Sequence, residues 1–86
     1  MSKQNIKQLF DATNALLTEL AVVSTKHGYH LDNDLESGLL ALLLDDNYNE
    51  MSLLKMRIKS AIKKMNDGTF KLSKNNTILS GIREVA

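Results

Sequence analysis

The amino-acid sequence predicts an all-α protein, an antiparallel four-helix bundle that forms a single domain over residues 1–86. Three observations support this fold class. Apolar residues recur at spacings of three and four in four segments, which is the spacing of one helical face. The chain contains no proline and four glycines, which suits long helices joined by short loops. Hydrophobic residues make up 43% of the chain and aromatic residues 5%, so the core must consist of leucine, isoleucine, valine and methionine.

The first predicted helix covers residues 3–27. Its apolar face consists of Ile6, Leu9, Phe10, Thr13, Leu16, Leu17, Leu20 and Val23. Gly28 stands where a helix commonly ends with a left-handed residue, and Lys26 and His27 suit the negative end of the helix dipole. We therefore expect the first helix to end at Gly28.

The second predicted helix begins at Asn33, whose side chain can cap the free amides while Glu36 completes the reciprocal pair. Leucines then cover most of its circumference: Leu35, Leu39, Leu40, Leu42, Leu43 and Leu44. Such a helix either lies at the centre of the bundle or forms half of an interface, for example that of a homodimer. Gly38 costs about 1 kcal/mol relative to alanine in mid-helix. We therefore expect a neighbouring helix to approach closely at this position.

The third predicted helix begins at Asn47, which repeats the capping pattern with Glu50, runs to about residue 66 and is ended by Gly68. Its apolar face consists of Met51, Leu54, Ile58, Ala61, Ile62 and Met65. Residues 69–73 alternate apolar and polar side chains, so we expect an extended connector that turns Phe70 and Leu72 inward. A short last helix is expected to follow, with Ile78, Leu79, Ile82 and Val85 on its apolar face.

The residue types that carry catalysis and metal binding are scarce. The chain has no cysteine, and its two histidines, His27 and His30, flank a helix end and do not share a helical face. They lack carboxylate or thiolate partners at the spacing of a metal site. The sequence also lacks a glycine-rich phosphate loop and a nucleophile elbow. We therefore predict a protein that is not an enzyme, holds no metal and no cofactor, and acts by binding.

Asp45, Asn47 and Asn49 resemble the first three ligands of a calcium loop. Such a loop needs glycine at its sixth position and glutamate at its twelfth, and this chain has Glu50 and Met56 there. A capped turn is therefore expected in place of a calcium site.

The sequence also bears on location. Its longest apolar run, residues 39–44, is too short to span a bilayer, and the N-terminus lacks the apolar stretch of a signal peptide. We expect a cytoplasmic protein whose membrane contact, if it has any, is peripheral at the inner face.

The charges are segregated along the chain although the net charge is +1. Residues 32–50 carry six acidic and no basic side chains, whereas residues 51–74 carry seven basic side chains and one acidic. On the third predicted helix, Lys55, Lys59 and Lys63 line one edge of the apolar face, and Arg57 and Lys64 line the other.

Three interpretations of this basic helix are open. It can be a solvated face whose lysine stems cover the edge of the core, a surface that docks on an anionic partner or membrane, or a nucleic-acid-binding element. The last is disfavoured, because Asp45, Asp46 and Glu50 at the start of the helix would repel phosphates and no aromatic residues interleave the lysines. We expect no nucleic-acid partner.

The order of several short segments is similar to that in a known family. The first helix begins with Ser-Lys-Gln-Asn-Ile-Lys-Gln-Leu-Phe (2–10) and ends in Thr-Lys-His-Gly (25–28), and the second contains Leu-Glu-Ser-Gly-Leu-Leu (35–40). The third is amphipathic and basic, and Phe-Lys-Leu-Ser (70–73) leads into Ile-Leu-Ser-Gly-Ile-Arg-Glu-Val-Ala (78–86). This layout resembles the immunity proteins of class IIa (pediocin-like) bacteriocins, the enterocin A immunity family.

The resemblance implies a cytoplasmic antiparallel four-helix bundle of a lactic acid bacterium or a relative, which protects the producer cell from a pore-forming peptide. It implies non-catalytic binding at the cytoplasmic side of the bacteriocin-bound membrane receptor, the mannose phosphotransferase permease, through the C-terminal half of the chain. Together with the charges, it predicts these partner-binding residues: Lys55, Arg57, Lys59, Lys63, Lys64, Phe70, Lys71 and Lys74. The alternative is a small helical regulator that binds and inhibits a soluble bacterial partner protein, and a nucleic-acid-binding protein is the third.

Overall fold

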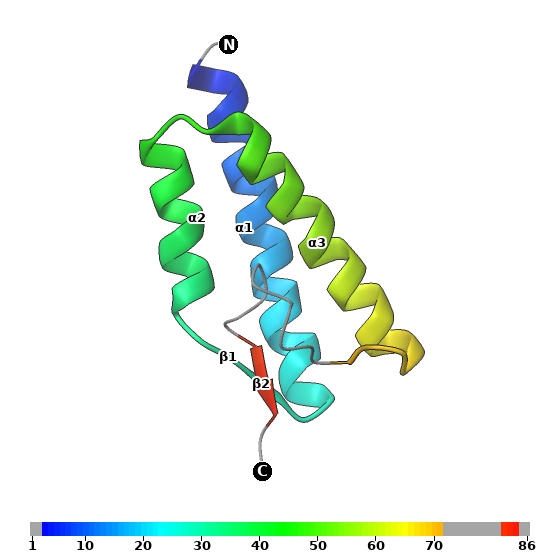
Figure 1. Cartoon of the computed structure of the whole chain (residues 1–86). Coiled ribbons are helices and arrows are strands. Elements are labelled where there is room, and N and C mark those ends of the chain that lie inside the picture. Colours follow the sequence, from blue (N-terminus) through cyan, green and yellow to red (C-terminus); the bar gives the residue numbers. More distant parts are fainter. Residues whose placement is uncertain (1–2, 72–81, 85–86) are drawn as a thin grey trace.

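The computed structural model describes residues 3–71 and 82–84 of the chain. Within these ranges the protein forms three helices and one two-stranded antiparallel sheet (Figure 1). The elements are α1 (Lys3–Lys26), β1 (Tyr29–Leu31), α2 (Asp34–Leu44), α3 (Tyr48–Asp67) and β2 (Ile82–Glu84). The structure is mostly helical, and the predicted all-α class is confirmed at this level.

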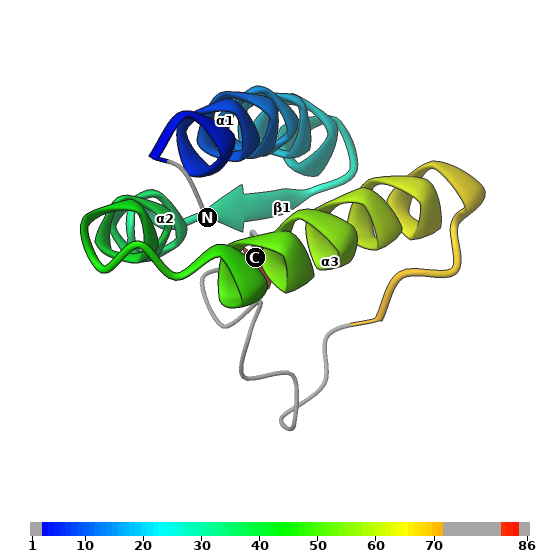
Figure 2. The ribbon, with the colours of Figure 1, turned by 90° about the horizontal axis from the view of Figure 1, so that it is seen from above.

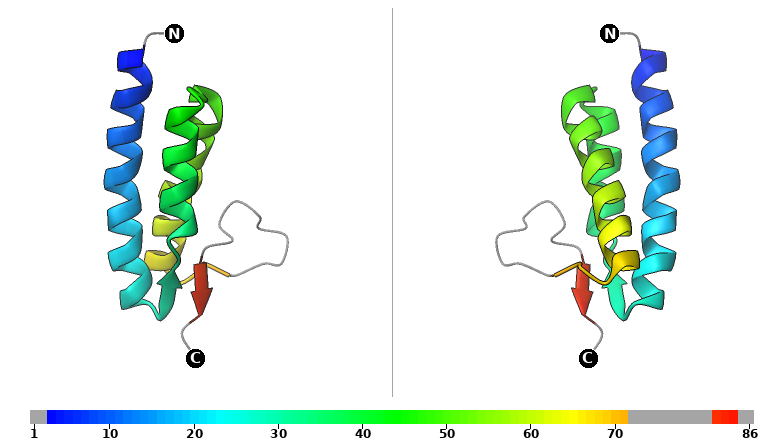
Figure 3. Two further views of the ribbon diagram at one scale, coloured as in Figure 1. Left: turned by 90° about the vertical axis from the view of Figure 1, so that its left-hand side faces the viewer. Right: turned by 90° about the vertical axis from the view of Figure 1, so that its right-hand side faces the viewer.

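The three helices pack around a shared core, with α2 running opposite to both α1 and α3 (Figure 1). Seen from above, their axes form a triangle, with β1 below one end of α1 (Figure 2). The sheet lies at the end of the molecule where α1 and α3 finish (Figure 3). The C-terminal ends of α1 and α3 are therefore close to each other and to β1.

The core contains apolar residues from all three helices. The buried ones are Ile6, Leu17, Leu20, Leu35, Leu39, Met51, Leu54, Ile58, Ala61, Ile62 and Met65. More than half of them belong to α3, which buries the six residues that its periodicity predicts. Thr13 is also buried, and its hydroxyl donates to the carbonyl oxygen of Leu9 at 2.7 Å, so burial leaves no unpaired hydroxyl there. The predicted inward faces of α1 and α3 are thus confirmed.

The predicted helix ends are confirmed in three of four cases. α1 ends just before Gly28 and α3 just before Gly68, and both glycines have positive φ. The Asn47 side chain accepts a hydrogen bond from the backbone N–H of Glu50 at 3.3 Å. The predicted cap at Asn33 is wrong, because its backbone is in the right-handed helical region and its side chain makes no capping bond. An N-cap residue normally needs an extended backbone to aim its side chain at the free amides.

α2 is more exposed than its leucines suggest. Leu35 and Leu39 are buried, whereas Leu40 is 48% and Leu44 77% exposed. The interpretation of α2 as the central helix is therefore wrong, since α3 occupies that role. The expected close approach at Gly38 is also wrong, because a Cβ added there would meet no atom within 4 Å.

The predicted fourth helix is contradicted where the structure describes it. Ile82–Glu84 form a strand that pairs antiparallel with β1, with Tyr29 opposite Glu84 and Leu31 opposite Ile82. The pairing supplies hydrogen-bond partners for backbone groups of β1. Gly81, Ile82 and Val85 also have lower helix propensities than alanine or leucine. Ile78, Leu79 and Val85 of the predicted helix lie outside the described residues.

The strand assignment at the C-terminal end is testable by NMR. We expect Cα chemical shifts of Ile82–Glu84 below their random-coil values, together with an Hα–Hα contact between β1 and β2. Helical shifts at these residues, without the cross-strand contact, would restore the four-helix prediction.

Two glycine-to-alanine substitutions should have opposite effects on stability. Gly68→Ala forces a side chain into the left-handed region at φ +76°, so it should lower the free energy of unfolding by about 1–2 kcal/mol. Gly38→Ala places a methyl group in open space in mid-helix and should raise it by about 0.5–1 kcal/mol. Urea unfolding followed by circular dichroism measures both. Equal effects would contradict the backbone assignment at Gly68.

Candidate functional site

Among the residues that the structure describes, no acidic side chain forms an ion pair with the basic side chains of α3. Within the described part of the chain, the ion pairs are Lys7 with Asp11 at 3.3 Å and His30 with Asp32 at 3.5 Å. Neither involves α3 or the connector that follows it. We define the basic surface as the described cations of this region: Lys55, Arg57, Lys59, Lys63, Lys64 and Lys71. All are exposed except Lys55, which is half-buried.

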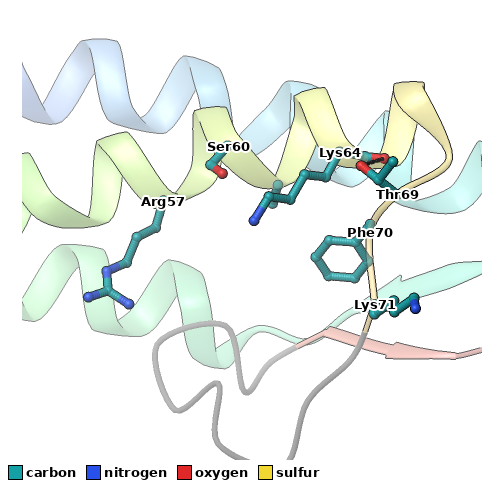
Figure 4. A pocket seen from close by; sticks show the side chains of 7 residues that line it. Arg57, Ser60, Lys64, Thr69, Phe70 and Lys71 are labelled. Atoms are coloured by element: carbon teal, nitrogen blue, oxygen red, sulfur yellow. Dashed lines mark hydrogen bonds between the residues drawn. The ribbon is translucent and has the colours of Figure 1, made fainter.

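The basic surface has two flanks on either side of the buried face of α3. Lys55, Lys59 and Lys63 follow one another at intervals of four residues on the first flank. On the second flank, Arg57 and Lys64 border a hollow of about 290 Å³ between α3 and residues 69–71, which we call the connector hollow (Figure 4). Its lining consists of Arg57, Ser60, Ala61, Lys64, Thr69, Phe70 and Lys71.

The structure therefore places the predicted partner-binding residues that it describes in two groups, one around the connector hollow and one on the other flank of α3. It brings Arg57, Lys64, Phe70 and Lys71 together around the connector hollow. The three lysines of the other flank do not line the hollow. Lys74 lies outside the described residues.

The end of α3 fixes the position of the connector. The carbonyl oxygen of Lys64 accepts the backbone N–H of Thr69 at 2.8 Å, and that of Met65 accepts the N–H of Gly68 at 3.2 Å. These two bonds form a Schellman motif, which reverses the chain at a left-handed residue. The N–H of Phe70 also donates to the Lys64 carbonyl at 3.1 Å. The connector is thus tied to the last turn of the helix that carries Arg57 and Lys64.

Phe70 forms one wall of the hollow, and its ring contacts the ring of Tyr29 in β1. The two rings meet edge to face, with centroids 5.2 Å apart and planes at 81°. This is a favoured geometry for aromatic pairs. Phe70 is half-buried, as the expected inward turn of the connector requires, and Leu72 of the same expectation lies outside the described residues.

The side chains around the hollow differ in direction. Arg57, Ser60 and Lys64 extend from the same stripe of α3, and the ring of Phe70 lies beside Lys64, while Lys71 points away from Arg57 (Figure 4). Ser60 and Thr69 add two hydroxyl groups that the sequence reasoning missed. The signal for Ser60 was present, because it lies three residues after Arg57 and four before Lys64.

A second hollow has the opposite character. It has a volume of about 320 Å³, lies between α1 and the start of α2, and is lined in part by Asp32, Asn33 and Glu36. Asp32 and Glu36 of the acidic segment thus border a different hollow from the one that Arg57, Lys64 and Lys71 line.

The residues considered for metal binding are dispersed. His27 and His30 are both exposed, and Asn47 of the calcium-like sequence is the N-cap of α3. Among the described residues no group of three or more histidine, aspartate or glutamate side chains could hold a metal ion. None of the helices in the described ranges has the length and hydropathy needed to cross a membrane.

The arrangement is chemically suited to bind an anion. Guanidinium and ammonium groups supply charge and several hydrogen-bond donors, and the described lining of the connector hollow contains no acidic side chain. Comparison with known proteins adds no family to this description: no protein-family model matches the chain, and no curated protein and no solved structure is significantly similar to it.

Proposed function

We propose that the protein is a non-catalytic bacteriocin immunity protein, which uses the basic surface to bind at the cytoplasmic side of a membrane receptor engaged by a class IIa bacteriocin. One observation carries the proposal: six cations of α3 and the connector are grouped on one helix and its C-terminal extension, and none of them has an ion-pair partner in the described part of the chain. We name the mannose phosphotransferase permease as the receptor because the sequence resembles the immunity family.

The charge distribution supports an anionic target. A membrane surface rich in anionic lipid attracts each nearby lysine or arginine by about 1 kcal/mol. Acidic loops of a membrane protein would attract the same groups. The outer side of α3 adds Leu53 and Met56, which are 43% and 64% exposed and lie between the basic flanks. Apolar side chains bordered by cations suit a peripheral contact at the inner face of the membrane.

The exposed leucines of α2 favour a second candidate, a small helical regulator that binds a soluble bacterial protein. Leu40 and Leu44 lie on a helix that carries no basic residue. A target that used this face would need no anionic groups, and charge reversal on α3 would leave its binding unchanged. Under this candidate the chain gives no resistance to any bacteriocin.

Reversing the charge of one flank tests the proposed function. Expression of the chain in a sensitive strain should raise the concentration of at least one class IIa bacteriocin needed to inhibit growth. The variant Lys55→Glu/Lys59→Glu/Lys63→Glu should lose this protection, because three lysines near an anionic surface contribute about 3 kcal/mol, more than a hundredfold in affinity. Its far-ultraviolet circular dichroism spectrum should stay helical.

A charge reversal on α1 provides the control. Lys7 and Lys26 are exposed and lie outside the basic surface, so Lys7→Glu/Lys26→Glu should keep full protection. Full protection by the α3 variant would remove its lysine flank from the mechanism. Absence of protection by the unmodified chain against a panel of class IIa bacteriocins would contradict the proposed function and favour the regulator.

A further inference from the structure

We propose that the connector hollow is a binding site for a small phosphate monoester, whose phosphate is held by Arg57, Ser60 and Lys64 and whose apolar body contacts Phe70. This inference rests on the proposed function, since it takes the second flank of the basic surface to be a binding surface. It goes further in naming the chemical group that this flank recognises.

Charge balance favours a phosphate monoester over a carboxylate. Three cations line the hollow, and its described lining contains no acidic side chain. None of the three forms an ion pair with another described residue. A phosphate monoester carries a charge of about −1.5 to −2 at pH 7, whereas a carboxylate carries −1. The group with the higher charge therefore compensates more of the local positive charge.

The available donors match the oxygens of a phosphate group. Arg57 offers a planar fork of N–H donors, Lys64 offers three, and the exposed Ser60 lies between them on the same stripe of α3 (Figure 4). Thr69 is a weaker candidate, because its hydroxyl already donates to the carbonyl oxygen of Lys64 at 3.5 Å. Lys71 points away from Arg57, so it contributes long-range attraction and no direct bond.

The apolar wall and the volume of the connector hollow limit the chemical type and size of the part of the ligand that is attached to the phosphate. Phe70 and Ala61 line the hollow, and the Tyr29 contact holds Phe70 in place. An aromatic or other planar apolar body attached to the phosphate can pack against this wall. A volume of about 290 Å³ is at the small end of ligand sites, which usually span about 300–1,000 Å³. The hollow therefore suits one small phosphorylated group, either a free molecule or the monoester headgroup of a lipid.

Phenyl phosphate is the probe for the free molecule. In titration calorimetry it should bind the full-length chain, and Arg57→Gln and Lys64→Gln should each weaken binding about tenfold, the effect of losing a charge-assisted hydrogen bond. Phe70→Leu should weaken binding of phenyl phosphate and leave that of inorganic phosphate unchanged. Benzoate, which has the same ring with a carboxylate, should bind more weakly than phenyl phosphate.

The matched control is Lys7→Gln/Lys26→Gln, which removes two exposed charges from α1, outside the basic surface. It should leave phenyl phosphate binding within about twofold, because exposed charges there are screened by salt over about 8–10 Å. Equal weakening by this control and by the hollow variants would show nonspecific attraction and overturn the proposal. Benzoate binding as tight as phenyl phosphate would overturn the preference for phosphate.

Vesicles distinguish the two sources of the phosphate. Phosphatidylcholine vesicles containing phosphatidic acid should bind the chain with the same dependence on Arg57 and Lys64 if the natural ligand is a lipid headgroup. Binding of phenyl phosphate without such vesicle binding assigns the site to a free molecule. Failure of both probes overturns the proposed site, whereas the bacteriocin challenge tests the proposed function separately, since protection can persist in a chain that binds no phosphate.

Discussion

The burial of one complete face of α3 is the constraint on which the rest of the structure depends. Met51 near its start and Met65 near its end are both buried, so the helix is fixed along its length. The Ser24 hydroxyl, also buried, lies 3.5 Å from the sulfur of Met65 and joins the ends of α1 and α3. Because the inward face is fixed, the backbone positions that carry the cations on the other faces are fixed relative to one another, although these cations form no ion pair within the described residues.

Lys64 connects this packing to the connector hollow. Its carbonyl oxygen accepts hydrogen bonds from Thr69 and Phe70, and its side chain borders the hollow that these residues complete. A change that loosens the last turn of α3 would therefore move the wall and the cation together. The same end of the molecule holds the contact between Tyr29 and Phe70, so the sheet and the hollow share a support.

The sequence predicted α1 and α3 well because their apolar residues occupy a single helical face. It failed for α2, since leucines on most sides do not indicate a direction, and the choice of Leu35 and Leu39 as core residues depends on where the other helices lie. It failed again at Ile82–Glu84, where pairing with a distant strand outweighs local periodicity. The cations of the site followed from the sequence, but the hollow did not. Its shape depends on how the chain turns after Gly68, and local patterns do not determine the path of a connector.

The sheet also has a consequence for the order of folding. β1 and β2 lie far apart in the sequence, with α2 and α3 between them and Leu31 paired to Ile82. Bringing such distant segments together costs loop-closure entropy, and this cost is smaller once α2 and α3 have folded and brought the two segments close. Each strand is three residues long, so few hydrogen bonds resist local separation. The two strands are therefore expected to join last and to separate first, with the helices still folded.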